Sequence, residues 1–210
     1  MMLRLYDFWE SGNCYKVRLL LSQLGEPFER VPIDILQGQT HTQSYAEKNP
    51  NRRVPLLEWP DGRTLAESNA ILFCLADGTP FLPTDPWQRA QVLQWMFFEQ
   101  YSHEPYIAVV RFWYFSGQLA PNTNALPGKM DDGYAALQVM EQHLERHKFF
   151  VGDAYSIADI ALFAYTHVAD EGGFELDRFP AIQRWLSNVS EQANHVAITD
   201  PVGVETQFVP

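Results

Sequence analysis

A serine at position 11 lies a few residues before the segment 15–24, whose apolar spacing predicts a helix. The first N–H groups of a helix lack partners within it, and the helix dipole adds positive potential, so this place favours an anion. The Ser11 hydroxyl can donate a hydrogen bond to such an anion. Taken alone, the local sequence favours the simpler alternative, in which Ser11 only caps the helix.

A glutamate–serine pair, Glu67-Ser68, precedes a second expected helix that runs to Leu75. The same helix-start argument suits Ser68 to a carboxylate or to an N-cap, and both roles can coexist. The carboxylate of Glu67 suits an ammonium group.

Short segments of alternating type fill the chain up to about Asp77. Gly25 ends the first helical pattern, and Pro60-Asp61-Gly62 is a turn signal between two apolar runs, which predicts a hairpin. In order, the expected elements are a strand (3–6), a helix (15–24), a strand (28–35), a hairpin (54–59 with 64–66) and a helix (68–75).

Beyond a linker over residues 78–86, the chain is expected to be entirely helical. Asp85-Pro86 is a cap followed by proline at the first helical position. Ser156 and Asp159 have the spacing of a capping box, with aspartate in place of the usual glutamate or glutamine. The expected helices span about 86–113, 131–147, 160–169 and 180–192.

The 210 residues, 46% of them hydrophobic, indicate a globular protein of one or two domains. The formal net charge of −11 disfavours binding to nucleic acid and to anionic membrane surfaces. No apolar run approaches the roughly 20 residues of a membrane helix, and we expect no signal peptide. Only two cysteines are present, so no disulfide framework is expected, and a cytoplasmic location is predicted.

Four motifs occur in order: SGNCYKVR (11–18), NPNRRVPLL (49–57), ESNAI (67–71) and the capping box SIAD (156–159). Together, at this spacing, they resemble the glutathione transferase superfamily over the chain to about residue 193. The resemblance implies an α+β fold, with a thioredoxin-like glutathione-binding domain over residues 1–77. A linker over 78–86 and an all-helical domain over 87–210 would follow.

The resemblance implies that Ser11 holds the glutathione thiolate, which is the nucleophilic form of the thiol. A free thiol of pKa about 8.5 is only a few per cent ionised at pH 7, and lowering its pKa by about two units takes roughly 2.7 kcal/mol. A hydrogen bond to a charged group, worth about 1.5–3 kcal/mol, supplies much of that. Asn13 is the alternative candidate for contacting the sulfur, because an asparagine at this position approaches the sulfur in some bacterial relatives that reduce disulfides with glutathione. It can equally close the turn.

The second and third motifs imply the remaining contacts with glutathione. Pro55 matches the cis-proline of the family, which would let the Val54 backbone pair with the cysteinyl backbone like an added strand. The sequence alone predicts a trans proline at a strand edge. Glu67 and Ser68 match the pair that holds the γ-glutamyl end. The other expected contacts are Arg53 and, for the glycine carboxylate, Thr40, with Gln39 and His41 as close alternatives.

In this family the long helix of the second domain borders the electrophile pocket. Here it carries the candidates Tyr101, Tyr106 and Arg111. An aromatic stripe is more often core than pocket wall. Arginine within an apolar stretch is more suggestive, because it needs a partner or an anionic ligand.

Two other features are interpreted as structural. Cys14 falls three residues past the reactive position of cysteine-type members, so we interpret it as a packing residue, and Cys74 as core. His143 and His147 have the i, i+4 spacing of metal ligands. No third ligand is evident, so we expect a solvated helix face and no metal.

The sequence therefore predicts a glutathione transferase with a detoxification role, which conjugates glutathione to a small, largely apolar electrophile of unknown identity. The alternatives are a glutathione-dependent disulfide or peroxide reductase and a non-catalytic binding or regulatory protein. A homodimer is expected from the resemblance. It is also expected because adjacent rings on a helix cannot all face one core. The aromatic residues concerned are Trp59, Phe73, Phe81, Trp95, Phe97 and Phe98.

Overall fold

The structure, a computed structural model, describes residues 2–208. Its contacts divide the chain into unit 1, Met1–Asp77 with Ala193–Pro210, and unit 2, Gly78–Gln192. The expected second domain ran to residue 210, and this is wrong for residues 193–208, which cluster with unit 1. Within residues 2–208, no helix has the length and apolar character needed to cross a membrane.

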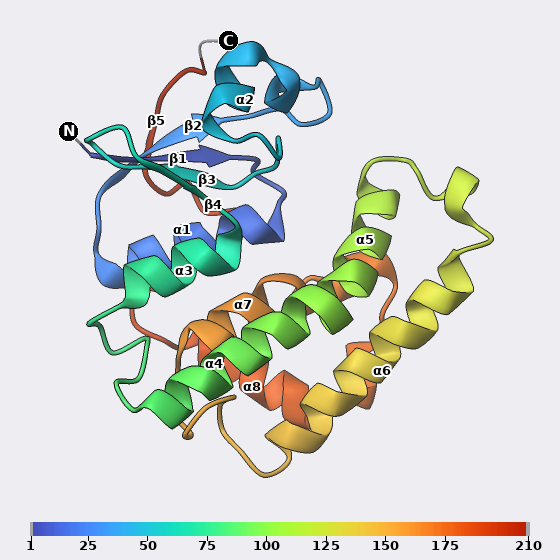
Figure 1. The fold of residues 1–210 in the computed structure, drawn as a ribbon. Helices are drawn as coiled ribbons and strands as arrows, with labels where there is room; N and C mark the ends of the chain where they lie inside the picture. Colours follow the sequence, from blue (N-terminus) through green and yellow to red (C-terminus); the bar gives the residue numbers. More distant parts are fainter. Residues whose placement is uncertain (1, 209–210) are drawn as a thin grey trace. The chain divides into compact units, whose positions relative to one another are not determined.

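Unit 1 is built on a five-stranded sheet in the order β4-β3-β1-β2-β5 (Figure 1). β1 is parallel to β2 and antiparallel to β3, and the β3–β4 hairpin forms at the predicted turn. The expected second strand, 28–35, ends at Pro32, because its register partner Asp7 is the last residue of β1. The strands are β1 (Leu3–Asp7), β2 (Phe28–Pro32), β3 (Leu56–Glu58), β4 (Thr64–Ala66) and β5 (Val204–Glu205).

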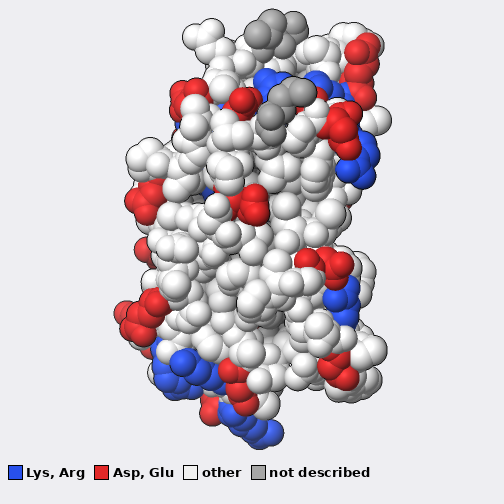
Figure 2. All heavy atoms as spheres, turned by 90° about the vertical axis from the view of Figure 1, so that its left-hand side faces the viewer, with Lys and Arg blue, Asp and Glu red and all other residues white. Residues whose placement is uncertain are grey.

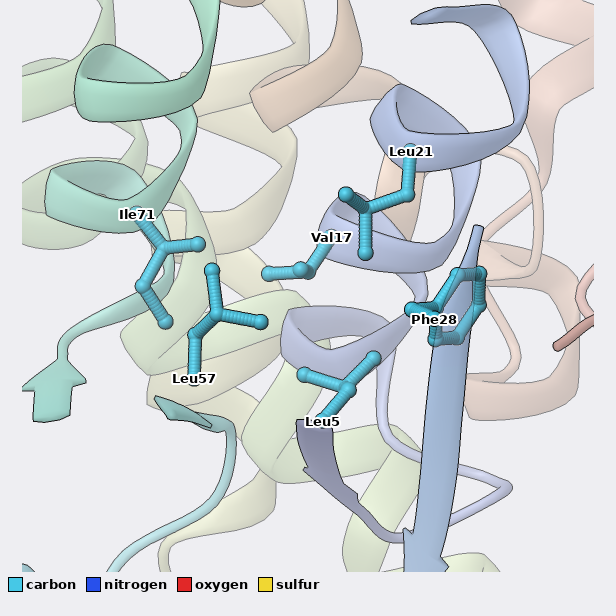
Figure 3. Close-up of a cluster of buried hydrophobic side chains, with 6 residues drawn as sticks. All are labelled: Leu5, Val17, Leu21, Phe28, Leu57 and Ile71. Atoms are coloured by element: carbon cyan, nitrogen blue, oxygen red, sulfur yellow. The ribbon is translucent and has the colours of Figure 1, made fainter. Parts of the chain in front are cut away.

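The helices of unit 1 are α1 (Gly12–Leu24), α2 (Gln43–Lys48) and α3 (Ser68–Ala76), with a 3₁₀ turn, η1 (Gln39–His41), before α2. Successive residues of a strand point to opposite faces, and β1 therefore serves two cores. Leu5 packs with residues of α1 and α3 in the cluster of Figure 3. Tyr6 packs with Tyr45 of α2 on the other face. The sequence did not predict η1 or α2, which are short and mostly polar.

Helix α1 ends at the predicted residue, Leu24, and begins at Gly12, three residues before the expected start at residue 15. Ser11 is the N-cap, and Gly25 is the C-cap with a φ of 68° that suits glycine. The N–H of Gly25 reaches the carbonyl of Ser22, and the N–H of Glu26 reaches that of Leu21, both at 3.0 Å. This pair of bonds is a Schellman motif, which satisfies carbonyls that the helix end would otherwise leave without donors.

The segment 193–208 returns across unit 1 and adds β5 to the sheet beside β2. The Tyr15 hydroxyl donates to the carbonyl of Val196 at 2.7 Å, and Arg18 donates to the carbonyl of Ile198 at 3.2 Å. These contacts are the physical reason that the segment belongs to unit 1. The sequence missed them because β5 has only two residues and the family resemblance ends near residue 193.

Unit 2 is built from helices around α7, in which all ten residues are buried. The predicted capping box is confirmed: Ser156 Oγ accepts from the N–H of Ala158 at 3.3 Å, and Asp159 Oδ2 accepts from the N–H of Ser156 at 2.9 Å. The helices are α4 (Pro86–Phe98), α5 (Glu104–Phe115), α6 (Leu126–Leu144), α7 (Ile157–Thr166) and α8 (Pro180–Ser190). Short 3₁₀ turns are η3 (Ala120–Asn122), η4 (Ala169–Gly172) and η5 (Leu176–Arg178).

The long helix expected over 86–113 is interrupted by a π-helical stretch, η2 (Glu99–His103), between α4 and α5. Here the N–H of Glu104 reaches the carbonyl of Glu99, five residues back. Pro105 explains the widened turn, because proline has no N–H to donate to the carbonyl of Tyr101 and its ring crowds that carbonyl. The sequence carried this signal in Pro105, and the prediction of one continuous helix overlooked it.

Candidate functional site

Ser11 is the half-exposed N-cap of α1. Its Oγ accepts a hydrogen bond from the N–H of Cys14 at 3.3 Å. This bond uses a lone pair of the oxygen, so the hydroxyl hydrogen can still be donated to an anion at the helix start. Capping and anion binding, which the sequence left as alternatives, are therefore compatible in this geometry.

Asn13, in the first turn of α1, faces the third motif. Its Oδ1 accepts hydrogen bonds from Lys16 Nζ at 2.8 Å and from Ser68 Oγ at 3.0 Å. An ammonium group only donates, which fixes the oxygen of the Asn13 side chain, rather than its nitrogen, at this position. Asn13 therefore connects the first motif to the third.

Lys16, which the sequence motifs did not point to, contacts both Asn13 and Ser68. Its side chain is fully buried, and its Nζ also lies 3.4 Å from Ser68 Oγ. Burying an ammonium is unfavourable unless hydrogen bonds compensate it. A lysine inside a helix whose neighbours Tyr15 and Val17 are apolar was the signal that could have found it.

Ser68 is the first residue of α3 and not its N-cap, which corrects the sequence interpretation. The cap position is taken by Glu67, whose φ of 68° lies in the left-handed region that glutamate rarely adopts. The Ser68 hydroxyl donates to Asn13 instead of capping the helix. Strained backbone of this kind is concentrated at functional sites, because only a constraining environment maintains it.

The second motif meets the third through Asn51, whose Nδ2 donates to Glu67 Oε1 at 3.4 Å. The Val54–Pro55 peptide bond is cis. The expectation from the family resemblance is thereby confirmed, and the trans form expected from the sequence alone is wrong. Pro55 is buried and Val54 is half-buried.

The backbone that leads into Val54 is held by two donors on the carbonyl of Arg53. Tyr45 Oη donates to it at 2.6 Å and Asn49 Nδ2 at 2.8 Å, while the Arg53 side chain is exposed. Within residues 2–208, the N–H and carbonyl of Val54 make no hydrogen bond to other backbone groups. They can therefore pair with an extended peptide.

The loop candidates are not connected to these residues by hydrogen bonds within the described chain. Thr40 is buried in η1, and His41 is exposed. Gln39 Oε1 accepts from the N–H of Asp34 at 2.7 Å and so stabilises its own loop. The choice between Thr40 and His41 stays a prediction.

The two cysteines differ in their surroundings. Cys14 is fully buried, and its Sγ accepts from the N–H of Phe8 at 3.3 Å. Burial, with the negative charge of Asp7, raises the pKa of this thiol far above its usual range, so it is a packing residue as expected. Cys74 is exposed on α3, so its interpretation as core was wrong.

The three candidates for the electrophile pocket, all in unit 2, have different environments. Tyr101 in η2 is 84% exposed, whereas Tyr106 in α5 is half-buried with Lys129 Nζ 4.9 Å from its ring centroid. Arg111 is buried, and its Nε donates to Glu171 Oε2 at 2.6 Å. A carboxylate of the same unit is thus a partner of this arginine.

His143 and His147 stack with their ring centroids 4.5 Å apart. His143 is half-buried against Trp95 and Phe150, so the expected solvated face is correct only for His147. Burial lowers the pKa of His143. Among residues 2–208, no group of three His, Cys, Asp or Glu side chains is arranged to hold a metal.

The formal net charge of the chain is −11. Figure 2 shows a face on which positive and negative side chains are intermixed and much of the surface carries neither. The affinity of an anion therefore depends on local groups, such as a helix start, more than on the total charge.

Comparison with known proteins decides the family. Residues 1–77 match the model of the glutathione S-transferase N-terminal domain, and residues 103–193 match that of the glutathione S-transferase C-terminal domain. The chain belongs to the glutathione S-transferase family. The predicted fold class, a thioredoxin-like domain followed by a helical domain, is thereby confirmed.

Two solved glutathione transferases illustrate the likeness. A glutathione S-transferase from Pseudomonas fluorescens is 52% identical with a TM-score of 0.94, over 95% of this chain and 100% of that one. A glutathione transferase from Burkholderia graminis, with two glutathione molecules bound per subunit, is 28% identical with a TM-score of 0.80. That alignment covers 92% of this chain and 85% of the other.

Among sequence relatives, the glutathione S-transferase-like protein LUC7 of a Fusarium species is 30% identical over 90% of this chain and 88% of its own length. The transcriptional regulator URE2 of Saccharomyces cerevisiae is 27% identical over 88% of this chain. The chain spans only 64% of the length of that regulator.

Proposed function

We propose that this family member is a glutathione transferase, in which the thiolate of bound glutathione attacks a small, largely apolar electrophile. One observation carries the proposal: hydrogen bonds join the three motifs, from Asn13 to Ser68 and from Asn51 to Glu67. Residues far apart in the sequence are thereby held together on unit 1 as donors and acceptors for a peptide.

The sulfur of glutathione would lie at the start of α1. The Ser11 hydroxyl, oriented by the N–H of Cys14, donates to the thiolate, and the helix dipole adds to this stabilisation. Both interactions favour the charged form of the thiol, so they lower its pKa. At neutral pH a larger fraction of bound glutathione is then ready to react.

The rest of the tripeptide is assigned to the second and third motifs. The γ-glutamyl carboxylate binds at Ser68 and the α3 start, and its ammonium binds Glu67. The cysteinyl backbone pairs with Val54. The remaining contacts are Arg53 and, for the glycine carboxylate, Thr40.

In the reaction, a sulfur lone pair forms a bond to the electrophilic carbon. A leaving group departs with its electron pair, or, in an addition, the negative charge passes to the electrophile and is later neutralised by a proton. The protein contributes orientation of the nucleophile and stabilisation of the thiolate.

On the electrophile side, Tyr106 has the most suitable surroundings of the three predicted residues, because its ring is half-buried and not fully exposed. Tyr101 and Arg111 stay predictions. Tyr101 is mostly exposed to solvent, and Arg111 already has a carboxylate partner in Glu171.

Calorimetry with millimolar glutathione, followed by turnover with an aryl halide as a generic electrophile, tests the proposal. We expect saturable binding and a conjugate detected by mass spectrometry. Absence of binding would overturn the proposal. Binding without turnover across an electrophile panel would favour the alternative of a non-catalytic binding or regulatory protein.

A second candidate is a glutathione-dependent disulfide reductase, in which Asn13 and Ser11 both approach sulfur. It is favoured by the Burkholderia graminis relative, which binds two glutathione molecules per subunit, since disulfide reduction consumes two glutathiones. One thiolate attacks the disulfide and expels a thiolate, and the second then resolves the mixed disulfide. An assay with glutathione and hydroxyethyl disulfide decides between the two: turnover far above that with electrophiles favours the reductase.

We also propose a two-fold symmetric homodimer in the cytoplasm. Trp87 and Phe97 of α4 are 72% and 69% exposed, and Tyr101 beyond them is also exposed. At about 100° per residue, Trp87 and Phe97 lie only about 80° apart around the helix, so α4 presents both exposed rings on one side.

Light scattering should give about twice the 24.2 kDa chain mass. Phe97→Glu should shift it towards the monomer, and a wild-type mass near 24.2 kDa would rule out a stable dimer.

A further inference from the structure

Lys16 is a buried charged group for which the proposed function has no role. We propose that Lys16 is a positioning residue that makes the site selective for ligands with an α-carboxylate at the end held by Ser68. The inference rests on the proposed function and deepens it. It depends on two contacts of Lys16 Nζ, at 2.8 Å from Asn13 Oδ1 and at 3.4 Å from Ser68 Oγ.

Ser68 has a single hydroxyl hydrogen, and it donates this hydrogen to Asn13 Oδ1 at 3.0 Å. To donate to a carboxylate, the hydroxyl must turn away from Asn13. The Asn13 oxygen then keeps the hydrogen bond from Lys16, so the turn does not leave a poorly solvated acceptor unsatisfied. Lys16 thereby lowers the free energy needed to redirect Ser68 to a ligand.

The ammonium of Lys16 also lies beside the oxygen of Ser68 and polarises it, which makes the Ser68 O–H a stronger donor. The positive charge also lies 3.4 Å from the Ser68 oxygen that would hold the carboxylate, and solvent screens this buried charge less than one at an exposed surface. Because Lys16 is fully buried, it acts through Ser68.

A purely structural lysine would support α1 equally for every ligand. The two roles separate with a pair of peptides that differ only in the carboxylate. These are glutathione and 4-aminobutyryl-cysteinylglycine, which is the same peptide without the α-carboxylate. The useful quantity is the ratio of their dissociation constants, because a general loss of affinity cancels in it.

Calorimetry on the full chain measures this ratio for wild type, Lys16→Met and Lys16→Gln. We expect wild type to prefer glutathione by about 10- to 100-fold, the range for a hydrogen bond to a charged group. Lys16→Met removes both charge and donor and should reduce the preference to about 3-fold or less, by the same reasoning. Lys16→Gln keeps a donor for Asn13 but not the charge, so its preference should fall between the two.

Two matched variants separate positioning from folding. Leu20→Val trims a buried side chain of the same helix, so it should lower the melting temperature and leave the preference unchanged. Ser68→Ala should abolish most of the preference by itself, and adding Lys16→Met to it should reduce it no further.

An undiminished preference in folded Lys16→Met or Lys16→Gln would overturn this inference alone. If Lys16→Met does not fold, Lys16→Gln and the pair with Ser68→Ala decide the question. Wild type that binds both peptides equally would also overturn it. Wild type that binds neither would overturn the proposed function together with the inference.

Discussion

The two units use buried polar groups for different purposes. In unit 1, the buried side chains of Lys16 and Ser68 and the half-buried side chain of Asn13 connect two motifs that are distant in sequence. In unit 2, the carboxylate of Asp159 accepts from groups of its own unit, including the indole of Trp185 at 3.0 Å. We propose that the first arrangement prepares a ligand site, whereas the second joins helices.

This difference explains why the glutathione side is defined more sharply than the electrophile side. The three predicted pocket residues of unit 2 include an exposed ring, a half-buried ring and an arginine bonded to Glu171. They do not form a hydrogen-bonded set within the described residues. Substitutions should therefore affect stability in unit 2 and chemistry in unit 1, and the following experiments test that division.

The largest effect is expected from Asp159→Ala. Three buried donors, the N–H groups of Phe150 and Ser156 and the indole of Trp185, lose their acceptor. At about 1–3 kcal/mol each, we expect a loss of at least about 3 kcal/mol. For a chain of this size that is a fall in melting temperature of roughly 6–12 °C, measurable by calorimetry. Glutathione affinity of the folded variant should be unchanged. A loss of affinity at full stability would contradict the claim that substitutions in unit 2 affect stability and not chemistry.

The same pair of proteins should differ in its pH dependence. Burial raises the pKa of Asp159 to about 6, above the value of about 3.9 expected for an unfolded aspartate. A raised pKa in the folded state means that the contribution of this group to stability is greatest at low pH and declines as the pH rises to about 6. Denaturant melts should therefore show a larger advantage of wild type over Asp159→Ala at pH 5 than at pH 7.

Ser11→Ala should have the opposite character. Its hydroxyl acts on a charge that matters most in the transition state, so we expect turnover with an aryl halide to fall by about 10²- to 10³-fold. The change in melting temperature and in glutathione affinity should be much smaller, although the lost cap costs about 1 kcal/mol. Steady-state kinetics measures this. An unchanged pH–rate profile would show that Ser11 only caps α1.

A smaller effect is expected from Arg111→Met. The partner carboxylate of Glu171 is half exposed, so breaking this pair should lower stability by only about 1 kcal/mol. Glutathione affinity should not change. If the KM for the electrophile rises strongly at nearly full stability, Arg111 belongs to the electrophile pocket and unit 2 contributes a defined site as well.

The smallest effect on activity is expected from Cys14→Ser. The buried thiol is not ionised at neutral pH, and a serine oxygen can accept from the N–H of Phe8 in its place. We expect nearly full activity with a modest loss of stability. A glutathione adduct mapped to Cys14 during turnover would instead assign the protein to the cysteine-dependent branch of the family.

The sequence was informative where a local signal decides the structure. Ser11, Gly25, the Pro60-Asp61-Gly62 turn and the capping box each specify backbone geometry through their own chemistry, and all four features are present. The cis bond before Pro55 was accessible only through the family resemblance.

The sequence was uninformative where distant contacts decide the structure. The apolar neighbours of Lys16 hint that it is buried, but its contact with Ser68, 52 residues away, cannot be predicted from the local sequence. The two residues of β5 carry no pattern, and their pairing depends on the exposed edge of β2. Pro105 was a local signal for the π-helical turn, but its outcome depends on how the surrounding helices pack.

The central claim is that unit 1 lowers the pKa of the bound glutathione thiol through Ser11. A titration of thiolate ultraviolet absorbance in the glutathione complex tests it directly. We predict a pKa about two units below that of free glutathione in wild type, and a return most of the way to the free value in Ser11→Ala while glutathione stays bound. The same pKa in both proteins, or a wild-type pKa equal to that of free glutathione, would contradict the account.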